Sequence, residues 1–156
     1  LDTPSRQVLQ LHTELPTSEE SIKNFLEKYS DCKDVDGIII FVIENEEGKN
    51  VGGISFHSRK RMHGTFSIGL DIDRPYWRRG YGEEAIRILL RYAFNERNYQ
   101  KFNSAVVVRD VASIGLHKKI GCVEEGRRRR MWYFDGQYHD EILFGLTREE
   151  FHENDS

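Results

Sequence analysis

Hydrophobic and polar residues alternate along several segments of this chain, which is the pattern of strands with one buried face. The clearest alternation is in residues 65–72, where the apolar positions are Phe66, Ile68, Leu70 and Ile72. The same pattern predicts further strands at residues 38–44, 51–57, 102–108, 127–134 and 138–146. The turn NEEGKN makes the first two of these a hairpin, and Asp135-Gly136 makes the last two another.

Three segments instead carry apolar residues at helical spacing. The first follows Leu15, with Thr17 or Ser18 as its N-cap and an apolar face made of Ile22, Phe25, Leu26 and Tyr29. The second begins near Gly82, with a stripe made of Ala85, Ile86, Leu89, Leu90, Ala93 and Phe94. The third covers 112–120 and ends at Gly121. The expected order is helix, three strands, helix, strand, helix and two strands, which is a mixed α/β or α+β fold.

Composition restricts the class of protein. The 156 residues suit one domain over 1–156, and a net charge of −3 gives no general attraction to nucleic acid or to an anionic membrane. The longest apolar run, GIIIFVI at 37–43, is too short to span a bilayer. There are only two cysteines, Cys32 and Cys122, and no secretory leader is recognised. We therefore expect a reduced, cytoplasmic protein.

The segment YWRRGYGEEAIRILLRYAF, residues 76–94, places two arginines and two glycines directly before a helix. Glycines leave room beside the backbone N–H groups of a helix N-terminus, where an anion binds readily. Arg78 and Arg79 add positive charge at the same place. We therefore expect a ligand that carries phosphate at this loop.

Three other interpretations of the loop compete with this one. Gly80, Gly82 and Ala85 satisfy a loose G-x-G-x-x-A dinucleotide pattern, but DRPYWRR separates it from the preceding strand, and Asp110 comes late for the expected acid. A P-loop would need Gly-Lys-Ser/Thr after the glycines. A strand-to-helix turn with glycines for shape alone stays open.

Three separated motifs resemble the GNAT acyltransferase superfamily, in order and in spacing. They are SIGLDIDRPYWRRGYGEEAIRILLRYAF, VVVRDVASIGLHKKIGCVEEGRRR and DGQYHDEILFGL. The resemblance covers about residues 15–151, and the nearest group includes the Rim-type ribosomal-protein N-terminal acetyltransferases. It implies a GNAT-like mixed, mostly antiparallel, splayed sheet flanked by helices. It also implies transfer of an acetyl group from acetyl-coenzyme A (acetyl-CoA) to an amine.

The resemblance also implies where the cofactor binds. The pyrophosphate would be held by Arg78, Arg79, Gly80, Tyr81, Gly82 and Glu83. The strand backbone that meets the pantetheine arm would come from Leu70, Asp71 and Ile72. Asp110 and Ser113 match the family's Asn-x-x-Ser, and an ionised aspartate only accepts hydrogen bonds, which argues against any contact in which this side chain donates.

The catalytic groups implied by the resemblance depart from the family pattern. Relatives carry a tyrosine that protonates the leaving thiolate where this chain has His117, four residues before Gly121. A histidine can supply that proton, or it can be a helix-surface residue, and both interpretations stay open. Relatives carry a glutamate base where this chain has Ser67, which could only hold a water. Asp71, on the same strand face, is expected to orient the cationic amine, or else to be a solvated strand-end charge.

The remaining polar features indicate structure rather than chemistry. The run RRRR at 127–130 could suggest nucleic acid, but a strand sends only half of these side chains to one face. A solvated strand edge, or a contact to the cofactor's ribose phosphate, is favoured. The six histidines show no ligand spacing, so no metal site is expected. Cys122 is expected to be a small core residue rather than a nucleophile.

The start of the chain is shorter than the family pattern. The family opens with a strand and a helix before the segment that matches LPTSEES, but only fourteen residues precede Leu15. We expect residues 1–14 to be a remnant of the first helix or a tail. The first edge strand would then be missing or supplied by another chain, and a homodimer is one way to supply it.

Together these features predict a GNAT N-acetyltransferase that acts by direct attack of a primary amine on acetyl-CoA, without an acyl-enzyme or a metal. The acceptor would be a small-molecule amine or a protein N-terminus, with no nucleic acid or membrane partner. The alternative is a non-catalytic GNAT-like module that binds a coenzyme and regulates a partner. Release of free coenzyme A in the presence of mixed amines distinguishes the two.

Overall fold

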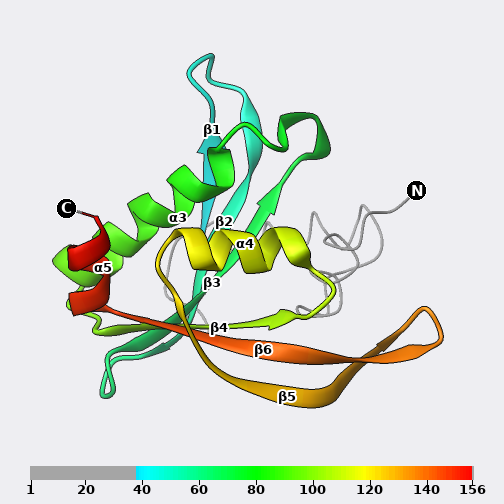
Figure 1. The fold of residues 1–156 in the computed structure, drawn as a ribbon. Helices are drawn as coiled ribbons and strands as arrows, with labels where there is room; N and C mark the ends of the chain where they lie inside the picture. The colour runs from blue at the N-terminus through cyan, green and yellow to red at the C-terminus, as the bar shows by residue number, and fades with distance from the viewer. Residues whose placement is uncertain (1–37, 156) are drawn as a thin grey trace.

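The computed structural model describes residues 38–155, which form one open sheet with helices on it (Figure 1). The strands are β1 (Ile39–Glu44), β2 (Asn50–Lys60), β3 (Thr65–Ile72), β4 (Lys101–Val107), β5 (Val123–Phe134) and β6 (Gln137–Thr147). The helices are α3 (Tyr81–Arg91), α4 (Val111–Lys119) and α5 (Arg148–Asn154), with a 3-10 turn η1 (Arg74–Tyr76) and a π-helical turn η2 (Tyr92–Glu96). The expectations for the helix after Leu15 and for residues 1–14 lie outside the described residues.

The strand order across the sheet is β1-β2-β3-β4-β6-β5. Every neighbouring pair is antiparallel except β3 and β4, which are parallel and joined by the α3 crossover. A parallel pair needs such a crossover because its connection must return to the starting end of the sheet. The prediction of a mixed, mostly antiparallel, splayed sheet flanked by helices is confirmed.

Helices α3 and α4 lie on the same face of the sheet (Figure 1). The predicted apolar stripe of α3 is buried at Ala85, Ile86, Leu89 and Leu90, and it continues through η2 at Ala93 and Phe94. These side chains pack on the alternating apolar positions of β2 and β3. The helical and strand periodicities of the sequence therefore meet in one core.

Phe66 is the centre of an aromatic cluster within this core. It is fully buried, and its ring centroid lies 5.1 Å from that of Phe56, 5.5 Å from Phe94, 5.4 Å from Tyr99 and 5.7 Å from Phe102. Centroid separations in this range are favourable for aromatic pairs. Phe66 is also the last residue of β3 that pairs with β4, so the cluster lies at the point where the two strands separate.

Hydrogen bonds to two backbone carbonyl oxygens close the same end of the sheet. The N–H groups of Gln100 and Lys101 donate to the carbonyl oxygen of Gly64, at 2.7 and 3.1 Å. The Arg148 guanidinium donates to the carbonyl oxygen of Tyr99, at 2.6 Å from Nη2. The start of β3, the start of β4 and the end of β6 are thus joined here.

Some predicted bounds are wrong in detail. β5 begins at Val123 rather than 127, because Val123 and Glu124 already pair with β6 ahead of a bulge between Glu124 and Gly126. Helix α5 was not predicted, because only one of its seven residues, Phe151, is buried, which leaves no apolar period to read. Its sequence signal is the capping box of Thr147 and Glu150, in which each side chain accepts from the other residue's backbone N–H.

Replacing Phe66 with alanine tests the role of the aromatic cluster. We expect Phe66→Ala to lower the free energy of unfolding by about 3–5 kcal/mol, because it removes a fully buried ring and leaves a cavity. Met62→Ala is the control, since Met62 is 92% exposed and should change stability by less than about 0.5 kcal/mol. Denaturant unfolding followed by circular dichroism measures both. Equal stability in the two variants would contradict the central place of Phe66.

Candidate active site

The parallel strands β3 and β4 separate soon after they begin to pair. Their register contains only two residue pairs, Thr65 with Lys101 and Phe66 with Phe102. Beyond these, β3 continues to pair with β2 on its other side, and β4 continues to pair with β6. Backbone N–H and C=O groups on the facing edges of the gap are therefore available to a ligand that lies between the strands.

The three strand residues expected to meet a pantetheine arm lie in this separated part of β3. Leu70 and Ile72 face helix α3, because Leu70 packs against the core and both side chains lie beside Gly82. Asp71 alternates to the opposite face and is exposed. The structure thus places these residues next to the α3 N-terminus.

The N-terminus of α3 presents unpaired backbone donors. The helix is preceded by Gly80 at its N-cap, and its first backbone hydrogen bond runs from Glu84 N–H to Gly80 C=O, at 3.1 Å. The N–H groups of Tyr81, Gly82 and Glu83 precede that bond and have no intrahelical acceptor. This arrangement can bind an anion such as a pyrophosphate.

The two glycines of the loop do different things. Gly80 has a φ of +84°, which side-chain-bearing residues rarely adopt, and a Cβ added to it would touch nothing within 4 Å. A Cβ added to Gly82 would lie 3.0 Å from Cδ2 of Leu70 and 3.7 Å from Cγ1 of Ile72. Gly80 therefore shapes the turn, and Gly82 lets the helix pack closely on β3.

Aromatic contacts hold the loop between β3 and α3. Trp77 Nε1 donates to the carbonyl oxygen of Ile72 at 2.6 Å. The rings of Tyr76 and Tyr81 meet edge to face at 6.1 Å, and the Arg79 guanidinium lies 5.7 Å from the Tyr76 ring centroid. Arg78 and Arg79 are both exposed, so the loop presents their charges beside the helix N-terminus.

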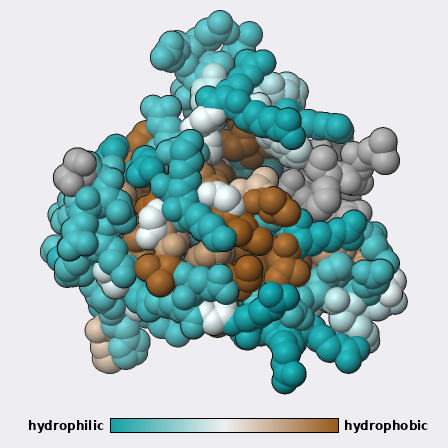
Figure 2. Space-filling view, viewed as in Figure 1, coloured by the Kyte–Doolittle hydropathy of each residue, from teal (hydrophilic) through white to brown (hydrophobic). Residues whose placement is uncertain are grey.

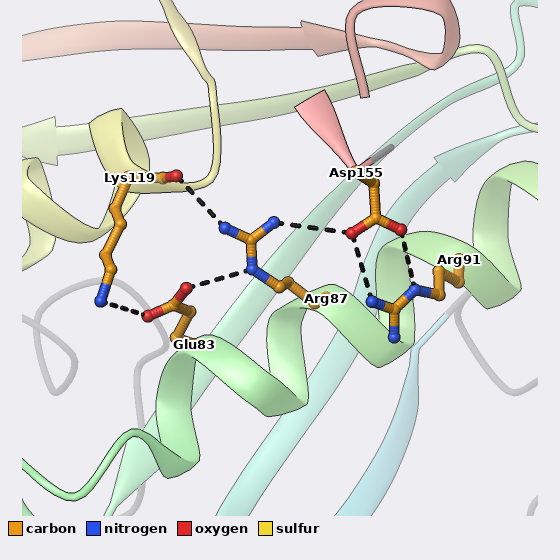
Figure 3. Close-up of polar contacts among 5 residues, drawn as sticks. All are labelled: Glu83, Arg87, Arg91, Lys119 and Asp155. Carbon is orange, nitrogen blue, oxygen red and sulfur yellow. Dashed lines mark hydrogen bonds and ion pairs between the residues drawn. The ribbon is translucent and has the colours of Figure 1, made fainter. Parts of the chain in front are cut away.

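An ion-pair network joins α3 to α4 and to the C-terminal end of the described chain (Figure 3). The Glu83 carboxylate accepts from Lys119 Nζ at 2.7 Å and from Arg87 Nε at 3.1 Å. The hydrogen bond from Lys119 lowers the Glu83 pKa below its usual range, with a further contribution from Arg87. Asp155 pairs with Arg91 at 3.0 Å and with Arg87 at 3.8 Å. Since the Glu83 carboxylate is engaged here, its backbone N–H is the group that could contact a cofactor.

Asp110 caps helix α4. Its Oδ1 accepts from the Ser113 backbone N–H at 3.0 Å. This contact needs only an acceptor, so aspartate serves it as well as the family's asparagine would. Asp110 and Ser113 therefore fix the start of α4.

His117 is buried, with 7% of its surface exposed, so the helix-surface interpretation is wrong. Its ring stacks against Phe144 at 5.1 Å and Phe102 at 6.1 Å. Nδ1 lies 2.7 Å from the Ser113 carbonyl oxygen, and Nε2 lies 2.8 Å from Ser104 Oγ. Because a carbonyl only accepts, the hydrogen-bond network assigns the proton to Nδ1, and Nε2 then accepts from the Ser104 hydroxyl.

These contacts limit what His117 can do. Burial lowers its pKa below the ordinary 6.5, although the Ser113 carbonyl and the nearby Asp110 charge act in the opposite direction. A neutral ring whose Nε2 already accepts a hydrogen bond is a poor direct proton donor. Ser104, which sequence reasoning missed, lies thirteen residues away on β4, and only the fold brings it to His117.

Ser67 and Asp71 lie on the sheet face opposite α3, as the alternation predicts. Ser67 is half-buried and pairs across the strands with His57 on β2. Asp71 lies four residues further along β3 and nearer the loop. The structure therefore brings these two residues to one face but not into direct contact with His117, which lies on the other.

The arginine run lies on β5, which is the last strand at one end of the sheet. Arg127 pairs with Asp140 at 2.8 Å. Arg128 pairs with the buried Glu141, whose other carboxylate oxygen accepts from Trp132 Nε1 at 3.1 Å. The backbone N–H of Arg130 donates to Asp140 Oδ1 at 2.8 Å, and its guanidinium lies 4.5 Å from the Tyr138 ring centroid. Three of the four arginines therefore make contacts within the β5–β6 hairpin.

Cys122 is half-buried and packs against the core. Burial raises the pKa of its thiol to about 12, with smaller contributions from the Glu150 and Glu125 charges. A thiol with this pKa stays protonated at neutral pH and is not an activated nucleophile. Cys122 is therefore a packing residue, as the sequence predicted.

Residues 38–155 show neither a cluster of metal ligands nor a membrane-spanning helix. No three His, Cys, Asp or Glu side chains in this part of the chain gather in an arrangement that could hold a metal ion. No helix in it is both long and apolar enough to cross a membrane.

The burial of His117 predicts a pH dependence of stability. Its native pKa lies below the unfolded value of 6.5, so between these two values the unfolded chain binds a proton that the native chain does not. Stability should therefore fall as the pH drops below about 6.5, by at most about 1.4 kcal/mol per pH unit. We expect His117→Gln to flatten this part of the curve, while the exposed control His63→Gln leaves it unchanged. Denaturant unfolding at pH 5, 6 and 7 measures it, and parallel curves for wild type and His117→Gln would contradict the assignment.

Comparison with known proteins finds relatives among N-acetyltransferases. YokL, an uncharacterized N-acetyltransferase from the SPbeta prophage of Bacillus subtilis strain 168, is 39% identical over 114 residues, which is 73% of this chain and 64% of YokL. YdaF, a putative ribosomal N-acetyltransferase from the same organism, is 26% identical over 133 residues, which is 85% of this chain and 70% of YdaF. This chain thus spans less than two thirds of YokL.

A solved structure and a family model complete the comparison. The spermidine/spermine N-acetyltransferase SpeG from Vibrio cholerae superimposes with a TM-score of 0.79 over 97% of this chain and 93% of its own. At 19% identity, that likeness shows the fold alone. A model described as an acetyltransferase (GNAT) domain matches residues 3–123, well over half of the 156 residues. The chain therefore belongs to the GNAT acetyltransferase domain family.

Proposed function

We propose that this chain transfers the acetyl group of acetyl-CoA to a primary amine. The observation that carries the proposal is the separation of β3 from β4 after Phe66, directly beside the open N-terminus of α3. A gap with unpaired strand backbone suits an extended amide-bearing arm, and the helix N-terminus suits a pyrophosphate. On the face of the molecule seen in Figure 2, apolar residues gather near the centre and are surrounded by hydrophilic residues.

The residues present fit such a donor. The backbone N–H groups of Tyr81, Gly82 and Glu83 would hold the pyrophosphate, with Arg78 and Arg79 as charge partners. Leu70, Asp71 and Ile72 would supply the strand edge for the pantetheine arm. Asp110 and Ser113 would act by fixing the start of α4.

The chemistry follows from these positions. Acetyl-CoA supplies an activated acyl group as its thioester. The backbone N–H groups of β3 would polarise the carbonyl oxygen, and the two faces of the gap would align donor and amine. Because the Cys122 thiol has a pKa of about 12, direct attack by the amine is the simplest route. Ser67 would hold a water on the face of β3 opposite α3, where we propose that the acceptor amine binds and which we call the acceptor face. Protonation of the thiolate by His117 stays a prediction.

The acceptor is proposed to be a primary amine of a small molecule or of a protein N-terminus. The names of SpeG and YdaF, which point to spermidine or spermine and to ribosomal substrates, support both classes. We place the reaction in the cytoplasm, on the ground of the cysteine usage.

Incubating the protein with acetyl-CoA and a panel of polyamines, N-terminal peptides, amino acids and amino sugars tests the proposal, with the products identified by mass spectrometry. Binding of acetyl-CoA without release of free coenzyme A would favour the non-catalytic regulatory module instead.

Charge reversal at Arg79 tests the cofactor loop. We expect acetyl-CoA at 100 times its dissociation constant to stabilise the wild-type protein by about 2.7 kcal/mol, seen as a rise in melting temperature. Arg79→Glu should abolish most of this rise, because it places a negative charge beside the pyrophosphate. Arg61→Glu makes the same change at the exposed β2–β3 turn and should keep the rise. Arg79 is preferable to Gly82 for this test, because a side chain at Gly82 would clash with Leu70. If acetyl-CoA raises the melting temperature of Arg79→Glu as much as that of the wild type, the loop is not part of the cofactor site.

Asp71→Asn tests the orienting role of the carboxylate. We expect the variant to raise the Michaelis constant for the amine severalfold with a smaller change in kcat, because it removes an attraction for the cationic substrate. The pH–rate profile should stay intact. Glu46→Gln, which removes a charge in the β1–β2 turn, is the control. Loss of the acidic limb in Asp71→Asn would instead identify Asp71 as the titrating base.

A further inference from the structure

The sheet face that carries Ser67 and Asp71 also carries a histidine of the neighbouring strand. His57 is on β2, half-buried, and is the direct cross-strand partner of Ser67. Side chains of directly paired residues point to the same face of a sheet and lie close together. His57 therefore shares the face that carries Ser67 and Asp71.

The imidazole of His57 lies near Gly69 of β3. A Cβ added to Gly69 would lie 3.7 Å from His57 Nε2 and 2.5 Å from Ser55 Oγ. Gly69 belongs to the part of β3 beyond the last β3–β4 pair, which is at Phe66. The absent side chain at Gly69 thus leaves room for a basic nitrogen over the part of β3 that no longer pairs with β4.

The chain around His57 is shaped to direct this ring. The β2–β3 register shifts between His57 and Lys60, and Ser58 has a φ of +50° at that bulge. Bulges commonly redirect a side chain beside a functional site. Nδ1 of His57 lies 3.0 Å from Ser58 Oγ. When Nδ1–H donates to that hydroxyl, Nε2 is the nitrogen that can accept a proton.

We propose that His57 is the general base that deprotonates the acceptor amine. Nε2 takes one proton from the substrate ammonium, which leaves a neutral amine. The amine nitrogen forms the new C–N bond as the C–S bond breaks, and the sulfur leaves with the bonding electron pair. The second amine proton goes to the thiolate, and the imidazolium returns its proton to solvent. Ser67 is too weak a base for this step, and an aspartate ordinarily titrates near 4, whereas histidine titrates near neutrality.

The charged groups on the same face set the surroundings of His57. From the described elements these are Lys60 on β2, which pairs with Thr65, Asp71 on β3, Lys101 on β4 paired with Glu125 at 2.7 Å, and Glu141 on β6 paired with Arg128. The Arg59 guanidinium instead lies 5.3 Å from the centroid of the Phe56 ring, on the core face. Positive and negative charges are both present, and Asp71 lies two residues beyond Gly69, toward the loop. A cationic amine above Gly69 would therefore meet a carboxylate on one side and the imidazole on the other.

This proposal rests on the proposed acetyl transfer, and His57→Gln tests it. The control is His63→Gln, which removes an exposed histidine from the β2–β3 turn. With an amine that the wild-type protein acetylates, we expect His57→Gln to lower kcat about 100-fold or more and to lose the acidic limb of the pH–rate profile. The rise in melting temperature with acetyl-CoA should be equal in both variants. Imidazole added to His57→Ala should restore part of the activity.

A second readout does not depend on turnover. The NMR signal of the His57 imidazole is identified by its absence from the spectrum of His57→Gln. When the same amine is added with desulfo-coenzyme A, this imidazole should titrate at a lower pH, because a neighbouring cation disfavours the imidazolium. An active wild type with less than a threefold loss in His57→Gln, or an unmoved titration, overturns the role of His57 alone. A wild type that acetylates no amine overturns the proposed function, and the role of His57 with it.

Discussion

The short pairing between β3 and β4 is the constraint on which the rest of the site depends. Two parallel strands joined by a crossover helix would normally continue side by side, but here the register ends at Phe66 and Phe102. The aromatic cluster around Phe66 fixes the point of separation, because four rings pack on it from β2, η2, β4 and the segment before β4. Beyond it, each strand keeps a partner only on its outer side. The gap is thus a property of the packed core.

Ion pairs and apolar packing contribute differently to this arrangement. The Glu83, Arg87 and Lys119 side chains are partly exposed, and pairs of this kind usually add little to stability. They do join the first turn of α3 to the end of α4, which fixes the direction of the helix N-terminus (Figure 3). Stability comes mainly from the buried stripe of α3 and the aromatic cluster beneath it. The network therefore orients the site that the core supports.

The sequence predicted those parts of the fold that local periodicity determines. The strand at 65–72 and the stripe of α3 were identified correctly, and Asp135-Gly136 forms the expected turn with φ values of +52° and +73°. The burial of His117 could not be predicted, because it depends on Phe144 and Ser104, which only the sheet brings to α4. The same limit applies to Gly82 and Gly69, whose missing side chains make room for residues of other elements. Site residues were therefore named from motifs, while their contacts required the fold.

Strand β3 presents side chains to both faces of the sheet, because consecutive side chains of a strand alternate in direction. Leu70 and Ile72 face α3, where we propose that the cofactor binds, while Gly69 and Asp71 face the opposite side, where we propose that the amine binds, so four consecutive residues would contact both substrates. A slip of one residue in the β2–β3 register would exchange the two faces, placing Asp71 against the core and Leu70 on the face opposite α3. The pairing of β3 with β2, anchored by Phe56 and Phe66 at 5.1 Å, prevents that exchange. The packing that opens the gap thus also determines which chemistry each side of it can present.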